Sequence, residues 1–284
     1  MSRKLRVLAV VLLATAFPHV VLGKGDHTTT TTVPSVFLED LTWTEVRDAM
    51  AQEGYNSVII PTGGTEQNGP HMVLGKHNYI VKYTAHEIAK GLGRTFVAPV
   101  MAYVPEGSIT PPEGHMQFAG TLSLPEHVFA SLLEYTARSL KQHGFQYIYF
   151  IGDSGGNQAM QAQVAEMLSQ EWQHDNVHVV HVGDYYQSAI DRQFEWLQQQ
   201  GYSQEAIGIH ASIRDTSELM ALHPDGVRNE HRKAPTACTA DAGSTQFDET
   251  GVMGDPTQAS VEIGTKLLQI KVDEAVKQIR MLRQ

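Results

Sequence analysis

The chain has 284 residues, of which 42% are hydrophobic, and its formal net charge is −10 at pH 7. This negative charge argues against nucleic acid or an anionic membrane as a natural partner, and the apolar content is that of an ordinary globular protein. Cys238 is the single cysteine, which excludes an intramolecular disulfide, a cysteine-based metal site and a CxxC redox centre.

Residues 1–23 have the pattern of a signal peptide, with a basic start, an apolar stretch at 7–17 and small residues before a cleavage site. An uncleaved membrane anchor is the alternative, but the apolar stretch is shorter than the ~20 residues that span a bilayer. Residues 24–36 contain a run of threonines and are expected to form a disordered spacer. We therefore expect an exported protein, periplasmic or secreted, that has no membrane contact after cleavage.

Residues 37–284 alternate between predicted helices and strands and are expected to form one α/β domain. In chain order the sequence predicts a helix at 42–52, a strand at 57–60, a helix at 78–90, a strand at 95–100, a helix at 125–143, a strand at 146–151, a helix at 157–172, a strand at 177–182, a helix ending at 222 and an amphipathic helix at 261–282. This alternation predicts a mostly parallel central sheet flanked by helices.

The loop at 61–78 carries the densest chemistry in the chain. It follows a buried strand and combines four glycines and two prolines with Glu66, His71 and His77. Carboxylates and imidazoles are the side chains that bind metal ions or move protons, and glycines let a backbone bend tightly around a ligand. The loop therefore points to an enzyme.

Two further polar, glycine-rich loops follow predicted strands, at 106–121 and 152–157. Active sites of parallel sheets lie beyond the carboxyl ends of the strands. We therefore expect these two loops and the loop at 61–78 to line one pocket.

Four segments, in the same order as here, are similar to motifs of the creatininase (creatinine amidohydrolase) family. They are GTEQNGPHMVLGKH at 64–77, HMQFAGT at 115–121, GDSGGN at 152–157 and HASIRDTS at 210–217. The resemblance implies a metal-dependent amidohydrolase with a three-layer α/β/α fold and one or two divalent ions at the strand ends. It also implies a homo-oligomer, often a hexamer in this family.

Most of the family's metal ligands are replaced in this chain. Glu66 matches the first carboxylate ligand, but Asn68 stands where the family has a histidine. His77 replaces the bridging aspartate, and Ser154 replaces the histidine of the third loop. Gly156 stands where some members carry a carboxylate. A ligand that bridges two ions needs negative charge and two lone pairs, which a neutral imidazole lacks, so the sequence favours a single ion.

We predict that this ion is zinc, with manganese or iron as alternatives. Its expected ligands are Glu66 and His77, with His71 or Asp153 completing a mixed nitrogen and oxygen set. Each of these side chains could instead stabilise the loops, by accepting backbone hydrogen bonds or by capping a helix. The predicted catalytic residues are Glu66, His77, Asp153 and Ser154.

The residues expected to contact the substrate are Asn68, His115, Gly155, Gly156 and Asn157. The predicted substrate is a small polar molecule with a cyclic or linear C–N amide bond. The expected reaction is its metal-dependent hydrolysis.

Two other functions compete with this one. Gly152, Ser154 and Gly156 match the Gly-x-Ser-x-Gly pattern of a nucleophile elbow, so Ser154 could be acylated with His77, His115 or His210 as the base. Alternatively, the altered ligand set could belong to a non-catalytic relative that only binds a small molecule. Glu66→Gln separates a metal enzyme from a binding protein, and Ser154→Ala tests the serine route.

Overall fold

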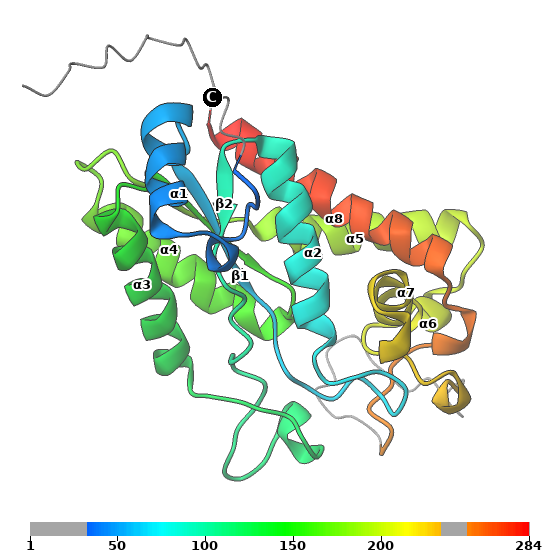
Figure 1. Ribbon diagram of the computed structural model, residues 1–284. Coiled ribbons are helices and arrows are strands. Elements are labelled where there is room, and N and C mark those ends of the chain that lie inside the picture. The colour runs from blue at the N-terminus through cyan, green and yellow to red at the C-terminus, as the bar shows by residue number, and fades with distance from the viewer. Residues whose placement is uncertain (1–32, 234–248, 284) are drawn as a thin grey trace, which may run out of the picture. The chain divides into compact units, whose positions relative to one another are not determined.

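The computed structural model describes residues 33–233 and 249–283 (Figure 1). The predicted signal peptide, and the predicted spacer up to residue 32, lie outside the described residues. In the remainder of that spacer, the Val36 carbonyl accepts a hydrogen bond from the Val97 amide at 2.8 Å. The described residues thus begin against the edge of the sheet.

Four parallel strands form the central sheet in the order β2-β1-β3-β4. They are β1 (Ser57–Thr62), β2 (Thr95–Val97), β3 (Tyr147–Gly152) and β4 (His178–His181). In the register, Val58 of β1 lies opposite both Phe96 and Ile148. All four predicted strands are present, and every pairing in the sheet is parallel as expected.

Eight α-helices accompany the sheet in the described residues. They are α1 (Trp43–Asp48), α2 (Lys76–Leu92), α3 (Glu126–Gln142), α4 (Gln158–Glu171), α5 (Gln187–Gln199), α6 (Gln204–Ile207), α7 (Ile213–Leu222) and α8 (Val261–Leu282). A reciprocal capping box starts α1, in which the Glu45 amide donates to Thr42 Oγ1 and the Thr42 amide donates to Glu45 Oε2. The helices α5 and α6 were not predicted.

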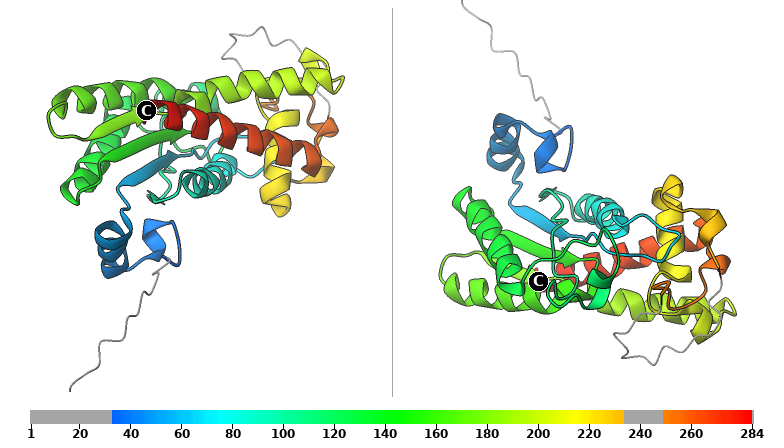
Figure 2. Two further views of the ribbon diagram at one scale, coloured as in Figure 1. Left: turned by 90° about the horizontal axis from the view of Figure 1, so that it is seen from above. Right: turned by 90° about the horizontal axis from the view of Figure 1, so that it is seen from below.

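Helices cover both faces of the sheet (Figure 2), and the side chains of β1 alternate between two cores. Val58 and Ile60 pack into a core with residues of α3 and α4. Ile59, which lies between them, packs into a second core with residues of α2 and α8. Burial on both faces explains why the middle of β1, Val58 to Ile60, is an unbroken apolar run instead of alternating with polar residues. The three-layer α/β/α fold with a parallel central sheet is thereby confirmed.

The terminal helix α8 carries part of the second core and also packs tightly against α7. A side chain at Gly264 would collide with the carbonyl oxygen of Ser217, so only glycine permits this approach. The contact places α7 beside the first turns of α8 at the carboxyl end of the sheet, where the loops after β1 and β3 also lie (Figure 1). Among the described helices, none combines the length and apolar character that a membrane crossing requires.

Candidate active site

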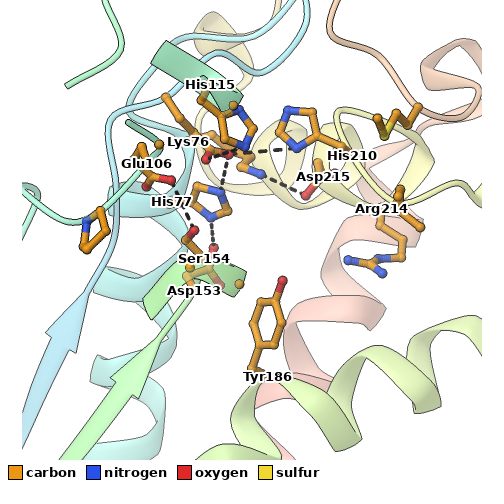
Figure 3. Close-up of a pocket in the computed structure, with 18 of the residues that line it drawn as sticks. Lys76, His77, Glu106, His115, Asp153, Ser154, Tyr186, His210, Arg214 and Asp215 are labelled. Carbon is orange, nitrogen blue, oxygen red and sulfur yellow. Dashed lines mark hydrogen bonds and ion pairs between the residues drawn. The ribbon is translucent and has the colours of Figure 1, made fainter. Parts of the chain in front are cut away.

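A cavity of about 370 Å³ lies at the carboxyl end of the sheet (Figure 3). The loop after β1 contributes Glu66, the loop after β2 contributes His115, and the loop after β3 contributes Asp153. Arg214 of α7 and Lys271 of α8 complete the walls on the other side. The prediction that the three loops line one pocket is confirmed, and the volume suits a small molecule.

Three metal-binding side chains meet in this cavity. Glu66 Oε2 lies 3.2 Å from His115 Nε2, and Glu66 Oε1 lies 3.9 Å from His210 Nδ1. One ligand atom from each residue lies within 4.8 Å of the other two. The His77, His115 and His210 rings outweigh the effect of burial and hold the pKa of Glu66 well below its usual range, so this carboxylate is charged. We call Glu66, His115 and His210 the carboxylate–histidine cluster.

Gln67 fixes the two histidines of the cluster from behind. Its side-chain nitrogen lies 3.2 Å from His115 Nδ1 and 3.1 Å from His210 Nε2. The His210 Nε2–H donates to the Gln67 backbone carbonyl at 3.0 Å, which leaves the Nδ1 lone pair directed to the cluster. The side-chain nitrogen of Gln67 can only donate, so it orients the two rings, whereas its backbone carbonyl also sets the tautomer of His210.

His77 lies between two carboxylates rather than at an open ligand position. Its Nε2 is 2.9 Å from Glu66 Oε1, and its Nδ1 is 2.7 Å from Asp153 Oδ2. Burial and the nearby Lys76 ammonium act to lower the pKa of His77, but Glu66 and Asp153 outweigh them and raise it. Both ring nitrogens therefore serve hydrogen bonds within the protein.

Asp153 is the most heavily bonded acid of the site. Its Oδ1 accepts hydrogen bonds from Lys271 Nζ at 2.6 Å and from the Tyr185 hydroxyl at 2.8 Å. Burial alone would raise its pKa, but Lys271 and His77 lower the pKa of Asp153 to about 2. Lys271, Asp153, His77 and Glu66 thus form one continuous row of charged contacts.

Two other buried acids differ in their charge. Burial and the adjacent charge of Glu66 raise the pKa of Glu106 to about 11, so its carboxyl group is protonated at neutral pH. Asp215 is instead paired with Lys76 Nζ at 2.9 Å. Burial would raise the pKa of Asp215, but Lys76 and Arg214 hold it well below its ordinary value.

Seven of the residues predicted from the sequence line the cavity, and three do not. Those that line it are Glu66, His77, His115, Asp153, Ser154, Gly155 and Gly156. His71 Nε2 instead lies 2.9 Å from Thr216 Oγ1, behind the cavity wall. Asn68 donates to the Glu66 carbonyl, and Asn157 donates to the Gly63 carbonyl, so both stabilise loops.

The histidines that lie in the carboxylate–histidine cluster are not the histidines that the sequence predicted as metal ligands. Ligand atoms of Glu66, His115 and His210 meet, whereas His77 uses both ring nitrogens to bridge Glu66 and Asp153, and His71 lies against Thr216. His210 opens the fourth motif, and this position was a signal that could have identified it. Gln67 had no comparable signal, because one glutamine in a polar loop is common.

Comparisons with known proteins agree with this architecture. A family model described as creatinine amidohydrolase matches residues 39–279. The mycofactocin precursor peptide peptidase of Mycobacterium tuberculosis is 26% identical over 240 residues, which cover 78% of this chain and 84% of the relative. The creatinine amidohydrolase of Pseudomonas putida is 24% identical over 196 residues, covering 67% of this chain and 73% of the relative.

Solved structures show the same fold. A structure titled "Creatininase Mn" superposes with a TM-score of 0.69 at 21% identity and covers 87% of this chain and 98% of its own. A second, of creatinine amidohydrolase (creatininase), gives a TM-score of 0.68 at 22% identity, with 87% and 97% covered. The superpositions show the three-layer α/β fold, and the family model and the named relatives show a hydrolase. The chain belongs to the creatininase family, as the sequence motifs indicated.

Proposed function

We propose that the protein hydrolyses a C–N amide bond, cyclic or linear, in a small polar substrate with the help of one divalent metal ion. The carboxylate–histidine cluster in the cavity carries this proposal. The names of two relatives, a peptide peptidase and a creatinine amidohydrolase, support cleavage of an amide bond.

The cluster fits a divalent ion by its chemistry and by its spacing. One carboxylate with two imidazoles is a ligand set of catalytic zinc sites. Ligand atoms ~2.1 Å from a tetrahedral ion lie about 3.4 Å apart. Glu66 Oε2 lies 3.2 Å from His115 Nε2 and Glu66 Oε1 lies 3.9 Å from His210 Nδ1, and one ligand atom from each of the three residues lies within 4.8 Å of the others. Small side-chain movements would bring this set to the spacing of a bound ion. We propose zinc, with manganese or iron as alternatives; two solved creatininases are titled as manganese and zinc forms.

The buried lysines favour one ion over two. Lys271 is paired with Asp153 and Lys76 is paired with Asp215, so these acids already have a cation beside them. A second divalent ion would need carboxylates that carry uncompensated charge. Glu66 is the acid at the cluster without a lysine partner.

A divalent ion at this position would supply Lewis acidity, polarising the substrate carbonyl and lowering the pKa of water toward ~7. The chain's own residues then hold the geometry. His77 fixes the orientation of Glu66 through its hydrogen bond, and Asp153 and Lys271 fix His77 in turn. The carboxyl group of Glu106 lies against Glu66 at the cavity wall, where we assign it the transfer of a proton to the leaving nitrogen.

The serine route has less support from the geometry. The hydroxyl of Ser154 donates to Glu106 Oε2 at 3.5 Å. Among the described residues, no imidazole is hydrogen-bonded to it, although a serine nucleophile needs a base within reach. A fluorophosphonate that labels Ser154 would favour this route instead.

The cellular setting is also part of the proposal. The basic and apolar pattern of residues 1–23 supports export to the periplasm or the medium. Membership of the creatininase family supports a homo-oligomer, for which we propose the hexamer implied by the resemblance. Size-exclusion chromatography with light scattering tests the oligomer, and a monomer at micromolar concentration would refute it.

The decisive test pairs amide hydrolysis with metal content. Purified protein would be loaded with zinc or manganese and assayed on cyclic and linear amides, beside Glu66→Gln and the control Glu195→Gln, whose side chain is 58% exposed. We expect Glu66→Gln to lose its metal and to lose activity by more than about a hundredfold, since several kcal/mol of stabilisation are removed. The control should keep both. Wild-type activity in metal-free Glu66→Gln would refute the metal mechanism.

A further inference from the structure

Arg214 is a buried cation that lines the cavity and has no acidic partner. Its exposed fraction is 8%. No ion pair among the described residues includes it, and its Nε has no hydrogen-bond partner. Burying a cation without an anion is unfavourable, so an unpaired guanidinium in a cavity wall needs an explanation.

The other two buried cations of the cavity show the contrast. Lys76 is paired with Asp215, and Lys271 is paired with Asp153. The protein therefore supplies an acid for each lysine but none within ion-pair distance of Arg214. The charge of Arg214 acts on Asp215 and Glu218 from a distance, but neither acid forms an ion pair with it. A ligand can therefore provide an anion in direct contact with the guanidinium.

The surroundings of Arg214 form a built site. The Phe194 ring lies 5.2 Å from the guanidinium carbon and supports its face. Figure 3 shows the Tyr186 hydroxyl turned into the same open space, without a hydrogen bond to the residues drawn. A side chain at Gly155 would come within 2.9 Å of that hydroxyl, so the glycine keeps the space open.

We propose that Arg214, assisted by Tyr186, binds a carboxylate group of the substrate. A guanidinium offers parallel N–H donors that match a carboxylate, and a tyrosine hydroxyl can donate a further hydrogen bond. The single guanidinium of Arg214 matches a ligand group that carries a single negative charge, such as a carboxylate. If the proposed function holds, the substrate is a small amide that also carries a carboxylate. Its amide group would lie at the carboxylate–histidine cluster and its carboxylate at Arg214.

The proposed carboxylate site at Arg214 can be tested by measuring the binding of small ligands that contain no amide bond to hydrolyse. The probes are 4-oxopentanoate and 2,5-hexanedione, which share a ketone carbonyl and differ in the carboxylate. Isothermal titration should show wild-type protein preferring 4-oxopentanoate by roughly tenfold to a hundredfold, the strength of a charge-assisted hydrogen bond. Arg214→Gln should lose this preference. Arg192→Gln should keep it, because Arg192 is exposed and pairs with Glu195.

Conservative variants keep the test valid if Arg214→Gln does not fold. Arg214→Lys retains the charge without the guanidinium fork and should show an intermediate preference. Tyr186→Phe should weaken binding of 4-oxopentanoate only. Equal wild-type affinity for the two probes, or an unchanged preference in a folded Arg214→Gln protein, would overturn the inference.

Two further binding competitions identify whether the carboxylate belongs to a peptide or to a small acid. Together with an assay of amide hydrolysis, they test the carboxylate site independently of the proposed function. If it is a peptide terminus, short peptides should displace 4-oxopentanoate and their C-terminally amidated forms should not. If it belongs to a small acid, N-acetylglycine should displace the probe better than any of these peptides. A carboxylate preference without any amide hydrolysis would support the anion site and refute the proposed function.

Discussion

Replacing Lys271 with methionine should destabilise the protein strongly. The lysine is 4% exposed, and its Nζ lies 2.6 Å from Asp153 Oδ1 and 3.6 Å from Glu218 Oε2. Methionine fills a similar volume but leaves Asp153 as a buried charge without its cation. Breaking a buried pair in this way costs about 3–5 kcal/mol, or roughly 10 °C in melting temperature for a domain of this size.

The pH dependence of this loss has a defined sign. Lys271 and His77 lower the pKa of Asp153 from its ordinary 3.8 to about 2. In the wild type, the stabilisation linked to this shift is present above pH 3.8 and is lost as the pH falls through 2. In Lys271→Met the pKa of Asp153 rises, so acid neutralises the unpaired charge. The stability difference between the two proteins should therefore narrow as the pH falls from 7 toward 4.

Urea unfolding followed by circular dichroism measures this difference. Lys277→Met is the matched control, because it lies on the same helix with 56% of its side chain exposed. It should change the free energy of unfolding by no more than about 0.5 kcal/mol. A Lys271→Met protein within about 1 kcal/mol of the wild type would show that Lys271 does not neutralise Asp153 in the folded protein.

Two further predictions concern ligand orientation and helix packing. Gln67→Leu should lower metal affinity roughly tenfold to a hundredfold in a chelator competition, because the side-chain amide that orients both cluster histidines is lost while the backbone carbonyl contact to His210 remains. Unchanged affinity would contradict the assigned role. Gly264→Ala should destabilise the protein by roughly 1–3 kcal/mol through its collision with the Ser217 carbonyl. Gly91→Ala, whose added methyl group meets Val276 at 3.4 Å, should be neutral or stabilise α2 by up to about 1 kcal/mol. Equal unfolding free energies for the two alanine variants would refute the packing argument.

Much of the fold could be predicted because its signals are local. The strands β1 and β3 are short apolar runs that end at glycine-rich turns, and α8 has both a serine cap and a long apolar face. Helix α5 was missed because its buried face includes Gln193. This glutamine donates to Glu218 Oε1 and to the Leu267 carbonyl, so a polar residue interrupts the expected apolar pattern.

The candidate site could be predicted only in part. Motif positions identified the cavity loops and Glu66, since those residues lie directly after strands. The partners of Glu66 and Asp153 come from distant parts of the chain, because His210 precedes α7 and Lys271 lies within α8. Lys271 interrupts the buried apolar face of α8 between Leu267 and Ala275, and this position was the local signal of a buried charge. Which imidazole faces which carboxylate depends on the packing of these helices.

Metal content per subunit tests the central claim most directly. Protein purified without chelator would be measured by mass spectrometry, beside Glu66→Gln, His210→Ala and the exposed control His178→Ala. The carboxylate–histidine cluster predicts one equivalent of a divalent metal in the wild type and the control, and loss of that metal in the other two variants. Two equivalents in the wild type, or full metal content in His210→Ala, would contradict a single ion held by Glu66, His115 and His210.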